Sequence, residues 1–229
     1  MIEIINVSKK FNSSGEGNEF WALKDINLTI ETGEFVAIVG RSGSGKSTLM
    51  NLIGTLDKPT SGNIYIDKED IVNVTNQKKE LYRNQKMGFI FQAFYLEPTY
   101  TVYENVEMPM LIKGVSHKER RKAIEESLSK VGLLHKAYER AKFLSGGEQQ
   151  RVSIARALVN NPGIILADEP CGNLDSNNSN QVMNILAELN LEGKTVIMIT
   201  HNMEDANKAK RIITIYDGKI IGDRKLKYV

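Results

Sequence analysis

The most informative stretch of the sequence is Gly40-Arg41-Ser42-Gly43-Ser44-Gly45-Lys46-Ser47-Thr48. It follows an apolar run at 35–39 and precedes the segment 49–53, whose composition predicts a helix. A strand, a Gly-rich loop and a helix in this order are the context that the phosphate-binding motif GxxxxGK(S/T) requires. The sequence therefore predicts a site for a nucleotide.

The chemistry of this loop suits a triphosphate. Backbone N–H groups of the loop and of the first helical turn can converge on phosphate oxygens, helped by the helix N-terminus. Gly40, Gly43 and Gly45 carry no Cβ, so the backbone can approach closely. Lys46 can reach the β- and γ-phosphates, and the Ser47 hydroxyl can bind Mg²⁺.

Composition bounds the class of protein. The net charge of the 229-residue chain is +2, which gives no reason to expect nucleic acid as a partner. The sequence contains no run of 18 apolar residues and no signal-peptide pattern, so we expect a chain that neither spans a membrane nor is secreted. The single cysteine, Cys171, excludes an internal disulfide and fits a reducing cytoplasm.

Short apolar runs predict a core of parallel strands that are buried on both faces. These runs lie at 35–39, 88–91, 164–167 and 196–199. Beside this core we expect antiparallel strands, because other segments are shorter or alternate between apolar and polar residues. Those segments lie at 2–7, 22–30 and 63–66, with a polar loop at 12–19. Asp217-Gly218, between apolar runs at 212–216 and 219–221, predicts a hairpin.

Strand patterns disappear between Gln92 and Asn161, and apolar residues there follow helical spacing. Ile124, Leu128 and Val131 are one example. We therefore expect a mainly helical insertion within an α/β core.

The apolar run at 164–167 is followed by two adjacent carboxylates, Asp168 and Glu169. Successive side chains of a strand alternate in direction, so we expect the two acids to have different roles. Asp168 is placed to hold Mg²⁺, through its water shell. Glu169 can orient and deprotonate an attacking water. The pair predicts hydrolysis of the bound nucleotide.

A second candidate phosphate-binding element is the segment 144–151, LSGGEQQR. Ser145 and Glu148 have the spacing of a capping box at the start of a helix. The pair Gly146-Gly147 lowers helix propensity, and we expect it to bring no structural benefit. The pair is explained if an anion approaches this helix N-terminus closely.

Together these motifs closely resemble those of the nucleotide-binding subunits of ABC transporters, over essentially all 229 residues. The segments 40–48, 144–151 and 164–170 resemble the Walker A, signature and Walker B motifs. Gln92, Asp175 and His201 match the Q-loop glutamine, the D-loop aspartate and the switch histidine. The resemblance implies an α/β fold of the RecA-like P-loop NTPase class, with a mainly parallel core, an N-terminal antiparallel β subdomain and an inserted α-helical subdomain.

The resemblance implies one ABC ATP-binding domain over 1–229. Its nucleotide-binding core would comprise 1–91 and 160–229, and its helical signature subdomain 92–159. Two copies would pack head to tail around two ATP-Mg²⁺, so that one signature caps the ATP on the Walker A motif of the other. The residues that touch that ATP in trans would be Ser145, Gly146, Gly147 and Glu148.

Further roles follow from the resemblance alone. Gln92 would sense Mg²⁺ and the attacking water, and His201 would hold the γ-phosphate and position the water of Glu169. An aromatic ring would stack on adenine; Phe11 is the first candidate, and Phe20 and Trp21 are alternatives. Cys171 stands where many relatives have Thr or Ser, and we expect it to pack passively.

One branch of the family is especially similar, in the segments 53–62, 92–106 and 168–176. It includes lipoprotein-releasing, macrolide-export, antimicrobial-peptide-resistance and FtsE-like cell-division ATPases. The implied partner is an integral membrane permease, which would hold this ATPase at the cytoplasmic face of the membrane. Exposed aromatic residues in the segment 92–106 would suit docking of the permease, whereas the alternative is a satellite core formed by Phe94, Tyr95 and Leu96.

Three other functions compete with a permease motor. The first is an FtsE-like ATPase that signals to cell-wall hydrolases, and the second is a non-transport ABC ATPase that acts on nucleic acid. The third is a nucleotide sensor without catalysis. Near-neutral charge and a single cassette argue against the second. The presence of Glu169, Gln92 and His201 favours ATP hydrolysis over the third.

Overall fold

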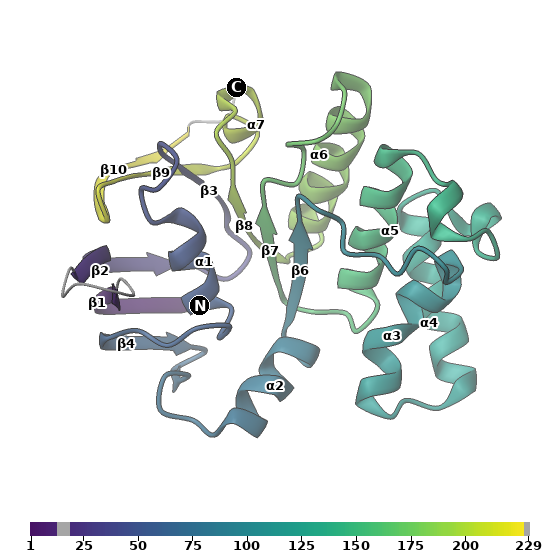
Figure 1. Cartoon of the computed structure of the whole chain (residues 1–229), viewed down its shortest axis with the longest axis horizontal. Helices are drawn as coiled ribbons and strands as arrows, with labels where there is room; N and C mark the ends of the chain where they lie inside the picture. Colours follow the sequence, from purple (N-terminus) through teal and green to yellow (C-terminus); the bar gives the residue numbers. More distant parts are fainter. Residues whose placement is uncertain (13–18, 227–229) are drawn as a thin grey trace.

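A six-stranded sheet lies at the centre of the molecule, in the order β10-β9-β3-β8-β7-β6 (Figure 1). Its strands are β3 (Phe35–Val39), β6 (Met87–Phe91), β7 (Ile164–Asp168), β8 (Thr195–Ile199), β9 (Arg211–Tyr216) and β10 (Lys219–Lys225). Every pairing is parallel except that of β9 with β10, which the predicted turn at Asp217-Gly218 connects. All residues of β3 and β8 are buried, which confirms the expected parallel core.

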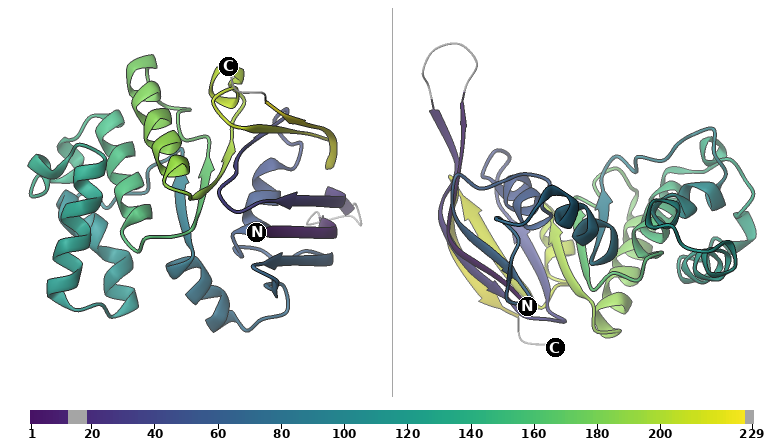
Figure 2. Two further views of the ribbon diagram at one scale, coloured as in Figure 1. Left: turned by 180° about the vertical axis from the view of Figure 1, so that it is seen from behind. Right: turned by 90° about the horizontal axis from the view of Figure 1, so that it is seen from below.

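A second sheet is antiparallel, in the order β2-β1-β4-β5. Its strands are β1 (Ile2–Asn12), β2 (Glu19–Ile30), β4 (Ser61–Ile66) and β5 (Glu69–Asp70). The computed structural model describes residues 1–12 and 19–226, so most of the polar loop expected at 12–19 lies outside the described residues. β1 and β2 are longer than predicted, because their far ends form a ribbon that extends away from the body (Figure 2) and lacks the alternating burial of a packed strand.

Helices cover both faces of the central sheet. They are α1 (Lys46–Ile53), α2 (Asn76–Gln85), α3 (Val102–Lys113), α4 (His117–Lys130), α5 (Gly146–Leu158), α6 (Ser176–Leu191) and α7 (Met203–Ala206). Helix α1 lies between the two sheets, where Leu49, Leu52 and Ile53 share one hydrophobic core with residues of both. On the other face α5 and α6 contact the sheet, and α3 and α4 pack against α5.

The insertion between β6 and β7 is helical, as the sequence predicts. Residues 92–163 are all described, and they form α3, α4, α5 and the short 3-10 turns η1 (Leu134–Lys136) and η2 (Ala141–Phe143), with no strand. A capping box of Thr101 and Glu104 begins α3, which satisfies backbone N–H groups that the helix itself leaves unpaired.

Helix α2 has no counterpart among the predicted elements. Tyr82 is its only buried residue, so the segment lacks the apolar stripe that makes a helix visible in a sequence. Thr75 caps its N-terminus by accepting a hydrogen bond from the backbone N–H of Lys78.

In the part of the chain that the structure describes, no helix combines the length and the apolar character needed to cross a membrane.

Arg211 of β9 connects the two sheets through polar contacts of its side chain. Its guanidinium donates to the backbone oxygen of Thr29 at 2.9 Å, and it forms ion pairs with Glu34 at 3.2 Å and Asp223 at 2.6 Å. The side chains of Arg211 and Glu34 are only 11% and 12% exposed. We expect Arg211→Met to lower the free energy of unfolding by about 2–4 kcal/mol, because it leaves Glu34 nearly buried without a charge partner.

Urea unfolding followed by circular dichroism measures this loss. The control is Arg224→Met, which removes the same charge from the neighbouring strand, where the side chain is exposed and forms no ion pair among the described residues. That control should change the free energy of unfolding by less than about 0.5 kcal/mol. Equal losses in the two variants would contradict the role of Arg211.

Candidate functional site

The loop 40–48 connects β3 to α1 and packs tightly against both sheets. A Cβ on Gly40 would lie 2.2 Å from the backbone oxygen of Ile215, and a Cβ on Gly45 would lie 2.4 Å from that of Ala22. Both glycines have positive φ, 154° and 106°. No side chain fits at either position, so the chain itself, and not only a phosphate, requires these two glycines.

The Lys46 ammonium is held inside the loop. It donates hydrogen bonds to the backbone oxygens of Gly40 at 2.8 Å and Arg41 at 3.0 Å. Lys46 is nearly buried, and it lines the cavity described next. Within the loop, the buried hydroxyl of Ser44 has no hydrogen-bond partner among the described residues. The loop thus presents a fixed positive charge and backbone N–H groups to one cavity.

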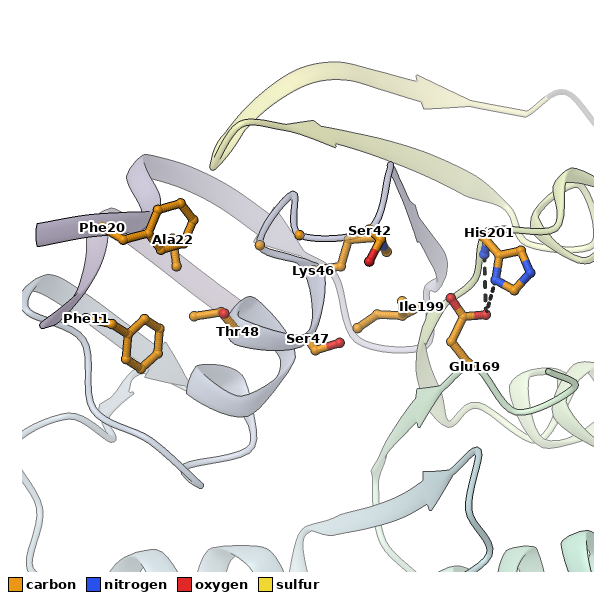
Figure 3. A pocket seen from close by; sticks show the side chains of 12 residues that line it. Phe11, Phe20, Ala22, Ser42, Lys46, Ser47, Thr48, Glu169, Ile199 and His201 are labelled. Carbon is orange, nitrogen blue, oxygen red and sulfur yellow. Dashed lines mark hydrogen bonds and ion pairs between the residues drawn. The ribbon is translucent and has the colours of Figure 1, made fainter. Parts of the chain in front are cut away.

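That cavity has a volume of about 410 Å³, and Figure 3 shows the side chains that line it. It is lined by Phe11, Phe20, Ala22, Ser42, Gly43, Gly45, Lys46, Ser47, Thr48, Glu169, Ile199 and His201. The predicted loop therefore faces the predicted carboxylate and histidine across one space. Aromatic rings lie at one end, and Glu169 with His201 lies at the other.

Two phenylalanines form the aromatic end. Phe11 of β1 and Phe20 of β2 are register partners, 43% and 55% exposed, and both rings face the cavity. Trp21, the next residue, does not line the cavity. The Lys10 ammonium lies 5.6 Å from the centre of the Trp21 ring. Of the three candidates for an adenine contact, Phe11 and Phe20 are thus placed at the cavity and Trp21 is not.

Asp168 ends β7 next to the start of α1. Burial raises the pKa of its carboxyl group, while a hydrogen bond with Ser47 and the charge of Lys46 act in the opposite direction. Carboxylate and hydroxyl oxygens side by side are the ligand types that Mg²⁺ prefers. Within the described ranges, no group of three or more acidic, His or Cys side chains could hold a metal. Ser47 and Asp168 therefore fit a Mg²⁺ ion that shares its coordination with phosphate oxygens and water.

Glu169 and His201 are in direct contact. The Glu169 carboxylate lies 2.9 Å from His201 Nδ1 and 3.4 Å from the His201 backbone nitrogen (Figure 3). Glu169 has a φ of 49°, in the left-handed region that few non-glycine residues adopt. The Glu169 backbone N–H donates to the backbone oxygen of Ile199 at 3.0 Å. The chain thus leaves the strand after Asp168 and turns at Glu169.

Gln92 is not brought to this cavity. Its side-chain amide donates to Asn173 Oδ1 at 3.0 Å, and Asn173 donates back to the Gln92 backbone oxygen at 3.2 Å. Gly172 leaves room for it, since a Cβ there would lie 2.8 Å from Gln92 Nε2. The glutamine thus lies against the segment 172–175, and its predicted contact with Mg²⁺ stays a prediction. Asn173 belongs to the segment 172–175 that resembles the D-loop, but no sequence pattern indicated its contact with Gln92.

The signature forms the expected capping box at the start of α5. Ser145 Oγ accepts from the backbone N–H of Glu148 at 3.4 Å, and the Glu148 carboxylate accepts from the backbone N–H of Ser145 at 2.9 Å. Ser145 and Gly146 are exposed. None of the four predicted contact residues of the signature lines the cavity of the same chain.

The expectation that the glycine pair brings no structural benefit is wrong for Gly147. A Cβ there would lie 1.9 Å from Asn178 Oδ1, whereas the nearest atom to a Cβ on Gly146 would be a Phe94 ring carbon at 3.9 Å. Asn178 belongs to the first turn of α6, where its backbone N–H donates to the capping residue Asp175 at 2.9 Å. The missing Cβ therefore lets the first turn of α6 pack against the signature.

Cys171 packs passively, as expected. The side chain is half-buried, and burial raises the pKa of its thiol to about 12, so the thiolate is absent near neutral pH. Its sulfur lies 3.7 Å from the backbone oxygen of Ser179.

Comparison with known proteins assigns the family. A family model described as ABC transporter matches residues 23–172. The chain belongs to the ABC transporter family. One relative, the uncharacterized ABC transporter ATP-binding protein YvrO of Bacillus subtilis, is 49% identical over 225 residues, which cover 98% of this chain and 97% of that protein. The macrolide export ATP-binding/permease protein MacB of Hyphomonas neptunium is 48% identical over 97% of this chain, which spans only 34% of MacB.

Solved structures of ABC cassettes agree with this assignment. The dimeric cassette MJ0796 matches with a TM-score of 0.91 and 46% identity over 100% of both chains. A dimeric post-hydrolysis state of that cassette, bound to ADP and Pi, matches with a TM-score of 0.90 and 44% identity over 100% of both chains. The predicted P-loop NTPase fold and ATPase class are confirmed. This ABC chain is an ATP-binding subunit that hydrolyses ATP.

The two signature glycines provide a matched pair of variants. We expect Gly147→Ala to lower the free energy of unfolding by about 1–3 kcal/mol, because its Cβ displaces the Asn178 side chain. Gly146→Ala should be neutral or stabilise by up to about 1 kcal/mol, since alanine favours a helix and the site is open. Thermal and urea unfolding of both variants measure the difference. A similar effect of the two substitutions would show that the Asn178 contact carries no constraint.

Proposed function

We propose that this ABC chain drives a membrane permease by forming a head-to-tail dimer around two ATP-Mg²⁺. One observation carries the proposal: the signature and the phosphate-binding loop are on different elements, and no signature residue lines the cavity of its own chain. A second copy can bring its exposed Ser145 and Gly146 to this cavity. The dimeric state of the MJ0796 cassette supports this arrangement.

Within each cavity we assign the phosphate contacts to residues 40–48. Lys46 would balance the charge of the β- and γ-phosphates, and Phe11, with Phe20 beside it, would stack on adenine. Ser47, Asp168 and Gln92 would hold Mg²⁺, which when bound withdraws negative charge from the phosphates. The full chain would act as one domain, with a nucleotide-binding core at 1–91 and 160–229 and a helical signature subdomain at 92–159.

Glu169 is the proposed general base. Its carboxylate is partly shielded at 19% exposure and accepts from His201, so it is aimed at the phosphate end of the cavity. It would take a proton from the water that attacks the γ-phosphate. His201 would hold the Glu169 carboxylate and the γ-phosphate in position relative to each other. Ser145, Gly146, Gly147 and Glu148 of a second copy would close the site, next to Asp175.

This assignment predicts the behaviour of Glu169→Gln. The variant should bind ATP, because the amide keeps the shape of the side chain, and should lose about 10²–10⁴-fold in turnover without the base. It should accumulate as an ATP-bound dimer. Phosphate release and analytical ultracentrifugation with ATP-Mg²⁺ measure both effects. Adding Ser145→Arg should prevent dimerisation and leave the ATP affinity of the monomer intact. Near-normal turnover of Glu169→Gln would exclude it as the base.

A second hollow, of about 600 Å³, provides the proposed permease-docking site. Apolar side chains of α2, β6, α3 and α5 and of their connections dominate its lining. Its most exposed members are Ile112, at 77%, and Tyr95, at 66%. Of Phe94, Tyr95 and Leu96, only Tyr95 lines this hollow, and Leu96 packs on the main core. Arg156 of α5 donates to the backbone oxygens of Phe94 and Tyr95 and thus connects the hollow to the signature helix.

The MacB relatives support a permease partner. They are named as ATP-binding/permease proteins, and this chain spans only 33–35% of those of Bartonella henselae and Aggregatibacter actinomycetemcomitans. We therefore propose a permease as the partner of this ATPase. Its docking would place this ATPase at the cytoplasmic face of the membrane.

Docking predicts a separable defect in the hollow. When the Glu169→Gln chain is purified from native membranes in ATP-Mg²⁺, it should bring with it a protein that mass spectrometry identifies as a multi-helix membrane permease. Adding Ile112→Glu should lower the amount of permease recovered by at least about tenfold, because it places a charge in an apolar contact. The ATP-dependent dimer should persist. The control is Leu191→Glu, at a side chain that is 81% exposed on α6. Equal recovery with Ile112→Glu would contradict docking in this hollow.

A further inference from the structure

The signature places a carboxylate beside the serine that is proposed to touch a phosphate. Glu148 Oε2 lies 3.0 Å from Ser145 Oγ and 2.9 Å from the Ser145 backbone nitrogen. An unbalanced carboxylate here would repel the γ-phosphate of the ATP bound to a second copy. It would also compete with that phosphate for the proton of the Ser145 hydroxyl. The signature therefore needs a compensating positive charge.

Lys136, in the turn η1, supplies that charge from outside the motif. Its ammonium lies 2.6 Å from Glu148 Oε1, on the carboxylate oxygen that Ser145 does not use. The two side chains are only 26% and 19% exposed, so water screens the pair weakly. Glu139 is a second and more distant partner, at 3.7 Å.

The titration of Glu148 agrees with this geometry. Hydrogen bonding to Lys136 is the largest cause that lowers the pKa of Glu148 to about 2, and the bonds from Ser145 act in the same direction. The pKa of Lys136 is raised by the same contact. Glu148 is thus ionised and paired near neutral pH.

We infer that Lys136 is a positioning residue for ATP-dependent dimerisation. It neutralises Glu148 and fixes one carboxylate oxygen, so that the Ser145 hydroxyl can turn to the γ-phosphate held by the second copy. Lys136 itself touches no nucleotide. This inference rests on the proposed function, in which the signature acts in trans.

The test measures dimer dissociation constants by analytical ultracentrifugation with ATP-Mg²⁺, in the Glu169→Gln chain at low salt. Lys136→Met should weaken the dimer about tenfold or more, because Glu148 then faces the phosphate unpaired. Added salt should reduce the difference in dimer dissociation constant between the Lys136→Met chain and its parent. In a Ser145→Arg background, which keeps the chain monomeric, the affinity for ATP should not change. Lys136→Arg should retain dimerisation.

A second substitution separates electrostatics from structure. In the Lys136→Met chain, Glu148→Gln removes the unpaired charge but keeps a polar side chain that can form the capping box and reach ATP in trans, so it should restore the dimer to within about threefold of the parent. A merely structural role of Lys136 would leave this double variant defective. The matched control is Lys142→Met, which removes the same charge a few residues away, where the lysine is exposed and forms no ion pair among the described residues.

The outcomes are distinct. Normal dimerisation of Lys136→Met, or failure of Glu148→Gln to restore it, would overturn the role of Lys136 while the dimer of the Glu169→Gln parent stands. A parent that stays monomeric in ATP-Mg²⁺ would overturn the proposed function, and this inference with it.

Discussion

The constraint on which the structure most depends is the contact of the phosphate-binding loop with the two sheets. The loop passes so close to β9 and β2 that neither Gly40 nor Gly45 could carry a Cβ. The same junction is closed by two backbone hydrogen bonds, from Gly218 to the Ser44 oxygen at 3.0 Å and from Lys24 to the Gly218 oxygen at 2.8 Å. The antiparallel sheet thereby supplies the aromatic end of the cavity, and the parallel sheet supplies its acidic end.

A protein that binds a triphosphate must keep its own carboxylates from repelling it, and each acid near the site has a partner. Asp168 is hydrogen-bonded with Ser47, Glu169 with His201, and Glu148 with Lys136 and Ser145. In each case one partner comes from a different segment of the chain. The acidic groups are thus positioned by the fold and not by neighbouring sequence alone.

The sequence predicts much of this site because its motifs are local. The loop at 40–48, the capping box of Ser145 and the strand end at Asp168 each depend on a few adjacent residues, and the structure contains all three. Contacts between segments far apart were missed, such as Gly147 with Asn178, because no pattern in either segment indicates the other. Helix α2 was missed for another reason: its residues are mostly polar or charged, and only one of them is buried.

The contact between Gly147 and Asn178 has a mechanical consequence in the proposed dimer. Asn178 follows the segment that leads from Glu169 of one ATP site, whereas the signature around Gly147 closes the other ATP site. A Cβ on Gly147 would overlap the Asn178 side chain, so the first turn of α6 lies directly against the signature. In the proposed dimer, a shift of the first turn of α6 at one nucleotide would therefore reach, through this contact, the signature that closes the other site.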